Sequence, residues 1–83
     1  MQPKRFHFDT IHALQIEAYN ARAKHPGNMH LLAALAEELG ELAKAHLENE
    51  TPERIRAEAV QVAVVALRIF EEGAGEFDPT PSA

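Results

Sequence analysis

The sequence predicts an all-α fold, a small antiparallel helical bundle of about three helices per chain that is completed by oligomerisation. Three observations support this class. Apolar residues recur at spacings of three and four in three segments, prolines and glycines separate these segments, and the last segment is apolar on most of its sides. The 83 residues are expected to form one domain, with a core over residues 9–73 and a tail over residues 74–83.

Composition narrows the functional classes. The chain has no cysteine, which excludes disulfides and thiolate metal sites, and its net charge of −5 argues against a nucleic acid polymer as partner. No apolar run approaches the roughly 20 residues of a membrane span, so no membrane partner is expected. The first residues lack the apolar core of a secretory signal, and a cytoplasmic location is therefore expected.

The first helix is expected to begin near Asp9 or Thr10, either of which is a suitable N-cap, and to run to Lys24. Its apolar stripe consists of Ile11, Leu14, Ala18 and Ala21. The sequence His25-Pro26-Gly27-Asn28 ends this helix, because proline disfavours the helical conformation before it and glycine favours a turn.

The second helix is expected over residues 29–48, with Asn28 as its N-cap. At 100° per residue its main apolar face contains Leu31, Leu35, Leu39 and Leu42. Glu38 is expected at one edge of this face, and Glu41 lies further round on the same flank. Alanines beside Glu38 leave space between the helices.

The third helix is expected over residues 52–72. Thr51 as N-cap, Pro52 at the first helical position and Glu53 near the positive end of the dipole all indicate its start, and Gly73 indicates its end. Its valines and alanines are distributed around the axis, so two neighbouring helices are too few to cover it. The sequence therefore predicts a homodimer or tetramer in which this helix contacts a second copy.

Three acidic residues are candidates for a functional site. Glu38 and Glu41 are three residues apart on one helix, and Glu58 precedes the apolar run of the next. Like charges at this spacing repel, and a buried carboxylate without a partner is costly. A divalent cation such as Mg²⁺, which prefers oxygen ligands, would relieve both effects. The alternative is a solvated acidic face on a purely structural bundle.

The segments NMHLLAALAEELGELA, from Asn28, and RAEAVQVA, from Arg56, resemble the MazG-like all-α nucleotide pyrophosphohydrolases, which include the dCTP pyrophosphatases. The resemblance covers residues 31–70. That family carries ExxE on one helix and ExxD on the next, and the four acids bind Mg²⁺. By position, Glu38 and Glu41 match the first pair and Glu58 opens the second. Gln61 stands where the family has aspartate, so one ligand charge is missing.

The resemblance implies a Mg²⁺-dependent hydrolase, with Mn²⁺ as an alternative ion, that converts a nucleoside triphosphate and water to the monophosphate and pyrophosphate. It also implies an active site near a subunit interface. Glu38, Glu41 and Glu58 would be catalytic, Gln61 would offer its carbonyl oxygen to the metal, and Glu38 or Glu41 would help to deprotonate the water. Lys44 is the candidate for phosphate binding, chosen by charge alone, as are Arg22, Lys24 and Arg54.

The missing charge at Gln61 predicts weaker metal binding and weaker catalysis. The alternative function is therefore a non-catalytic helical oligomer that binds a nucleotide or a protein partner.

Overall fold

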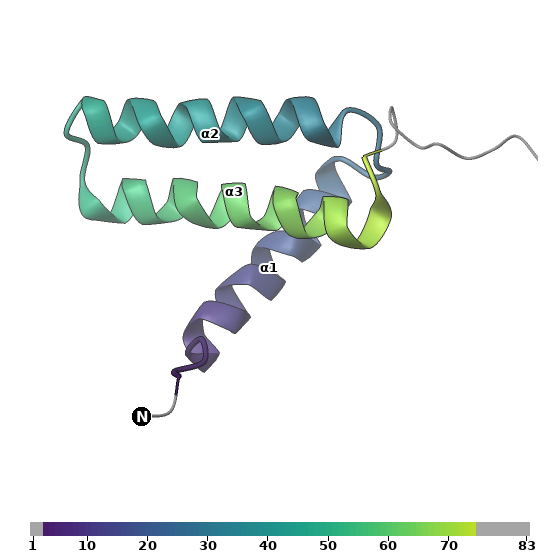
Figure 1. Ribbon diagram of the computed structural model, residues 1–83, viewed down its shortest axis with the longest axis horizontal. Coiled ribbons are helices and arrows are strands. Elements are labelled where there is room, and N and C mark those ends of the chain that lie inside the picture. The colour runs from purple at the N-terminus through teal and green to yellow at the C-terminus, as the bar shows by residue number, and fades with distance from the viewer. Residues whose placement is uncertain (1–2, 75–83) are drawn as a thin grey trace, which may run out of the picture.

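The computed structural model describes residues 3–74, and this part of the chain contains three helices and no strand. They are α1 (Phe8–Lys24), α2 (Leu31–Leu47) and α3 (Pro52–Glu72). In Figure 1, α2 and α3 run antiparallel side by side, and α1 crosses α3 at a wide angle. Helix α3 contacts both other helices and is the central element. The all-α prediction is confirmed. None of the three helices combines the length and apolar character needed to cross a bilayer.

Helix α1 begins at Phe8, slightly earlier than expected. Its N-cap is His7, in extended conformation, and no side chain caps the first turn, so neither Asp9 nor Thr10 has the predicted capping role. Asp9 instead lies in the first turn, where its negative charge favours the helix dipole. The half-buried residues of α1 are spaced three and four apart and form one stripe: Leu14, Glu17, Ala18 and Ala21. An acidic residue therefore lies within the packed face of α1.

Helix α2 differs from the prediction at its start and in the face that it buries. Its N-cap is His30, with a φ of 64°, and Asn28 does not cap it. The Asn28 side chain instead donates a hydrogen bond from Nδ2 to the backbone oxygen of Glu72 at 2.6 Å. Leu39 is exposed, while the side that packs on α3 is rotated toward small residues and contains Leu31, Ala34, Leu35, Glu38, Leu42 and Ala45.

This rotation has a packing reason. Alanines on α2 leave space for the β-branched side chains of α3, among which Val62, Val65 and Ile69 are half-buried. Glu38 is therefore near the middle of the packed face of α2, whereas the periodicity of the leucines placed it at the edge. This position is the first indication that Glu38 has a role beyond solubility.

Helix α3 begins and ends as predicted. The Thr51 hydroxyl oxygen accepts a hydrogen bond from the backbone N–H of Arg54 at 3.2 Å, Pro52 occupies the first turn and Glu53 lies near the positive end of the dipole. Gly73, with a φ of 79°, ends the helix in a conformation that favours glycine. The buried residues of the described chain are few: Leu31, Ala45, Val64, Glu58 and Arg68.

A polar cluster of side chains links the α1–α2 connection to the end of α3 through hydrogen bonds and ion pairs. Arg68, only 3% exposed, donates from Nη2 to the backbone oxygens of His25 at 3.0 Å and Gly27 at 2.6 Å, and from Nε to Glu72 at 3.0 Å. The intrahelical Arg68–Glu72 ion pair expected from their spacing of four is present. Arg22 of α1 pairs with both Glu71 and Glu72 at 2.7 Å.

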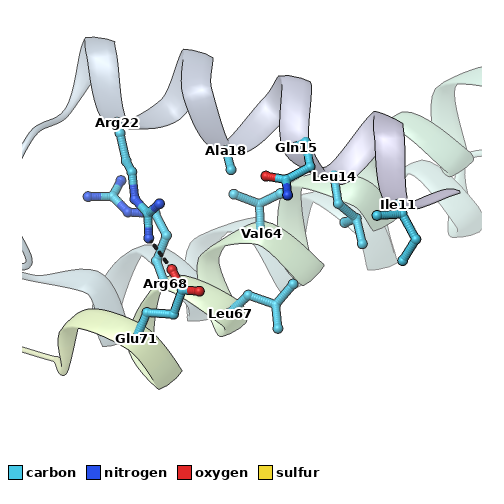
Figure 2. A pocket seen from close by; sticks show the side chains of 9 residues that line it. All are labelled: Ile11, Leu14, Gln15, Ala18, Arg22, Val64, Leu67, Arg68 and Glu71. Carbon is cyan, nitrogen blue, oxygen red and sulfur yellow. Dashed lines mark hydrogen bonds and ion pairs between the residues drawn. The ribbon is translucent and has the colours of Figure 1, made fainter. Parts of the chain in front are cut away.

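Figure 2 shows the cavity that lies beside this cluster, between α1 and α3. Its volume is about 260 Å³. Apolar side chains, among them Leu14, Val64 and Leu67, line most of it, and the Arg22–Glu71 ion pair lies at one end. The candidate site acids do not line this cavity.

Candidate functional site

A second and larger cavity, of about 430 Å³, lies where α1 and α2 meet α3. Each helix contributes polar side chains to its wall: Glu17 and Lys24 from α1, Glu37 and Glu38 from α2, and Gln61 and Arg68 from α3. The α1–α2 connection completes the wall with His25, Pro26, Gly27, Met29 and His30. Two of the residues selected from the sequence, Glu38 and Gln61, therefore meet at one cavity although 23 positions separate them.

The surroundings of Glu38 disfavour its charged form. Burial raises the pKa of its carboxyl above the ordinary value of 4.5, and the charges of Glu58, Glu41, Glu37 and Glu17, in that order, raise it further. Burial disfavours the charged form, and nearby negative charges act in the same direction. Acids on all three helices thus contribute negative potential at the carboxyl of Glu38. A cation is the ligand that this arrangement favours.

Glu58 is buried, with 8% of its surface exposed. Its Oε1 lies 2.9 Å from Nη2 of Arg54, which is four residues earlier on α3. Arg54 also approaches Glu50 at 3.8 Å. Because the ion pair satisfies the buried carboxylate, Glu58 has a protein cation as its partner in a single chain.

The remaining predicted ligands differ in burial. Gln61 is half-buried in the cavity wall, and Glu41 is exposed on α2. Across residues 3–74, no three histidine, aspartate or glutamate side chains converge closely enough to hold a metal ion. The oxygen donors of Glu38, Glu41, Glu58 and Gln61 are nevertheless of the kind that Mg²⁺ prefers. The donor chemistry fits the ion, while Glu58 would have to leave Arg54 in order to bind it.

Of the four cations that charge alone suggested, Lys24 lines the cavity and Lys44, Arg22 and Arg54 do not. Lys44 is exposed in the last turn of α2 and does not line the cavity. Arg22 and Arg54 are engaged by carboxylates. Lys24 and Arg68 do line the cavity, and Arg68 is committed to the loop oxygens and Glu72. Lys24 is therefore the lysine placed to meet an anionic ligand in the cavity.

Glu17 was not selected from the sequence, although a signal for it exists. It occupies position i+3 in a stripe that also contains Leu14, Ala18 and Ala21, so a helical projection places an acid on the packed face of α1. If only the apolar members of that stripe are considered, Glu17 is not identified. Its carboxylate brings a further negative charge to the cavity that contains Gln61.

Comparisons of this chain with protein-family models, with curated proteins and with solved structures find no match. A function for this chain must therefore be inferred from the geometry and chemistry of its own residues.

Proposed function

We propose that this protein is a Mg²⁺-dependent nucleoside triphosphate pyrophosphohydrolase, weakened by Gln61, as the resemblance to the MazG-like enzymes implies. The observation that carries the proposal is the position of Glu38. It is half-buried beside a cavity of about 430 Å³, and carboxylates from three helices act on it. A purely structural helix has no need of an acid in its packed face, where repulsion reduces stability.

Each residue has a role in this proposal. Glu38, Glu41 and Glu58, with the carbonyl oxygen of Gln61, would hold the ion, and Mn²⁺ is an alternative to Mg²⁺. When bound, the ion would supply neutralisation of the triphosphate charge and a more acidic water. Glu38 is suited to accept the proton of that water, because burial and its acidic neighbours raise its pKa toward the working pH. Lys24 lines the cavity and would contact phosphate oxygens, a role for which Lys44 is less well placed.

A non-catalytic nucleotide- or protein-binding oligomer is the second candidate, and one observation favours it. Arg54 already pairs with Glu58 at 2.9 Å, so the buried acid of α3 is satisfied without a metal. Loss of the family aspartate at Gln61 acts in the same direction, since an amide carries no charge to attract the ion.

The test is pyrophosphate release from a panel of ribo- and deoxyribonucleoside triphosphates, with Mg²⁺, with Mn²⁺ and with a chelator. The wild type is compared with Glu38→Gln, with Gln61→Asp and with Glu48→Gln, which removes an exposed charge next to the end of α2. Thermal denaturation with and without Mg²⁺ serves as an independent readout of ion binding.

The proposal predicts metal-dependent turnover that falls at least about 100-fold in Glu38→Gln, rises in Gln61→Asp and is unchanged in Glu48→Gln. Mg²⁺ should also raise the melting temperature of the wild type and not that of Glu38→Gln. If neither the wild type nor Gln61→Asp releases pyrophosphate from any triphosphate, the enzyme proposal is wrong. Nucleotide-dependent stabilisation without turnover would then support the non-catalytic candidate.

A further inference from the structure

The two faces of the layer formed by α2 and α3 differ in what covers them. Helix α1 packs on one face and passes behind α3 in the view of Figure 1. The α3 residues toward α1 include the buried Val64 and Arg68. No other helix of the described chain contacts the layer, so its opposite face has no covering element within residues 3–74.

The residues of the opposite face can be identified from helical geometry. Each residue of an α-helix is rotated by about 100° about the helix axis from the residue before it. On each helix we count this rotation from the side that contacts the other helix, in the N- to C-terminal direction. Because α2 and α3 are antiparallel, the positions at about 40–140° lie on the same open face of both helices. None of these positions on either helix is Asp, Glu, Lys or Arg, although they include His46 of α2, and Arg56 of α3 lies just beyond the edge. We define the apolar face by six of its members: Leu32, Leu39, Ala59, Ala63, Ala66 and Phe70.

The apolar face is open in a single chain. Leu39 is 55% exposed and Phe70 is 85% exposed, while Leu32, Ala59 and Ala66 are also exposed. A strip without Asp, Glu, Lys or Arg is unusual on a chain in which these four residue types make up 25% of the residues. Contiguous exposed apolar surface of this kind marks an interface.

The relief of the apolar face indicates what covers it. Helix α2 contributes a ridge of leucines, and α3 contributes a parallel strip of alanines. A two-fold axis that lies in the plane of the interface and runs parallel to the helices would place the leucines of each copy over the alanines of the other, which gives an isologous interface. Since each copy has a net charge of −5, a face without charges also lets two copies meet with little repulsion.

The size of the apolar face comes close to what a stable interface buries. The 17 residues of α2 span about 25 Å, and two packed helices are about 20 Å wide, so the face covers about 500 Å² in projection. The relief of the side chains adds to this area. Stable interfaces bury roughly 600–1,000 Å² per partner, which such a face approaches.

We propose that the apolar face binds a second copy of this chain, so that α2 and α3 of two copies form a four-helix core with both α1 helices outside. Glu37 and Glu38 line the cavity on the α1 side of the layer, and the acidic site therefore stays open in the dimer. This arrangement differs from the interfacial active site that the family resemblance implies. The proposed dimer does not depend on catalytic activity.

The experiment measures the mass of the full chain by light scattering during size-exclusion chromatography and by sedimentation over a range of concentrations. The variants are Leu39→Glu on α2 and Ala66→Glu on α3. Ile16→Glu is the matched control, because Ile16 is 50% exposed on α1, outside the apolar face. Circular dichroism reports whether each variant remains helical.

We expect the wild type and Ile16→Glu to be dimers, and Leu39→Glu and Ala66→Glu to dissociate with dissociation constants raised at least about 100-fold, because each dimer contains the new charge twice. A monomeric wild type would overturn the proposal and indicate another occupant. Dimers that persist in both face variants, or that Ile16→Glu also abolishes, would overturn it as well. If Leu39→Glu loses its helicity, the helical Ala66→Glu variant decides.

Discussion

Replacing Arg68 with methionine tests whether the polar cluster holds α1 and its connection to α2 in place. Methionine keeps most of the apolar stem, so the change removes mainly the guanidinium. Without the guanidinium, the protein loses the hydrogen bonds to the backbone oxygens of His25 and Gly27 and the ion pair with Glu72. Arg68 is 3% exposed, so solvent screens these interactions little.

The size of the effect can be worked out from these contacts. A hydrogen bond from a charged donor contributes about 1.5–3 kcal/mol, and breaking a buried ion pair costs about 3–5 kcal/mol. Two factors reduce the sum: His25 and Gly27 are exposed, so water can reach their oxygens, and Arg22 still pairs with Glu72. We expect the free energy of unfolding to fall by about 2–3 kcal/mol.

Urea denaturation followed by circular dichroism, at one fixed protein concentration, measures this change. Arg22→Met is the control. Arg22 is exposed and its ion pairs are at the surface, where solvent screens them, so its loss should cost clearly less than the loss of Arg68. A loss in Arg68→Met no larger than that in Arg22→Met would refute the reasoning, because burial of the guanidinium would then contribute nothing.

A pH series gives a second readout of the same cluster. The hydrogen bond from Arg68 lowers the pKa of Glu72, with a smaller contribution from the Arg22 hydrogen bond, although burial opposes the shift. A lowered pKa in the folded state stabilises the protein above the ordinary value of 4.5, and this contribution is lost as the pH falls through the folded pKa. Arg68→Met should therefore lose less stability between pH 5 and acid conditions than the wild type does.

Three further predictions test other elements. Thr51→Ala removes the cap of α3 and should lower stability by about 1 kcal/mol in urea denaturation, whereas Thr10→Ala, which caps nothing, should change it little. Gly40→Ala should raise stability by up to about 1 kcal/mol, because a Cβ there meets nothing within 4 Å, and a loss would reveal a contact with another chain. Glu38→Gln should raise the melting temperature at pH 7 without metal, since its raised pKa costs stability as the pH rises above 4.5, and the gain should vanish below that pH.

The helices themselves could be predicted because their signals are local. Thr51, Pro52 and Gly73 each act on neighbouring backbone groups, and α3 begins and ends where they indicate. The start of α2 was predicted less well, because the side chain of Asn28 can hydrogen bond either to the first turn of α2 or to a distant part of the chain. Its side chain binds the backbone of Glu72, 44 residues away, and no local rule anticipates that bond.

The site could be predicted only in part, for a related reason. Periodicity shows which residues share a face, but the rotation of that face toward its neighbour depends on both helices. The alanines of α2 allow close packing of α3, and this turns Glu38 inward and Leu39 outward. Similarly, Arg68 was expected to pair with Glu72, and its bonds to the α1–α2 connection depend on the tertiary fold.

The acidic cavity and the apolar face are connected through stability. Only Leu31, Ala45 and Val64 are buried apolar residues in the described chain, which is little for a domain that must offset an ordering cost of about 1–2 kcal/mol per residue. Glu38 subtracts further stability, because burial and the neighbouring acids disfavour its charged form. Burial of the apolar face against a second copy would add hydrophobic stabilisation on the side of the layer away from the cavity. Dissociation of the dimer by Leu39→Glu should then make the protein more sensitive to the charge of Glu38, so that Glu38→Gln raises the melting temperature of the dissociated variant, while Glu48→Gln does not.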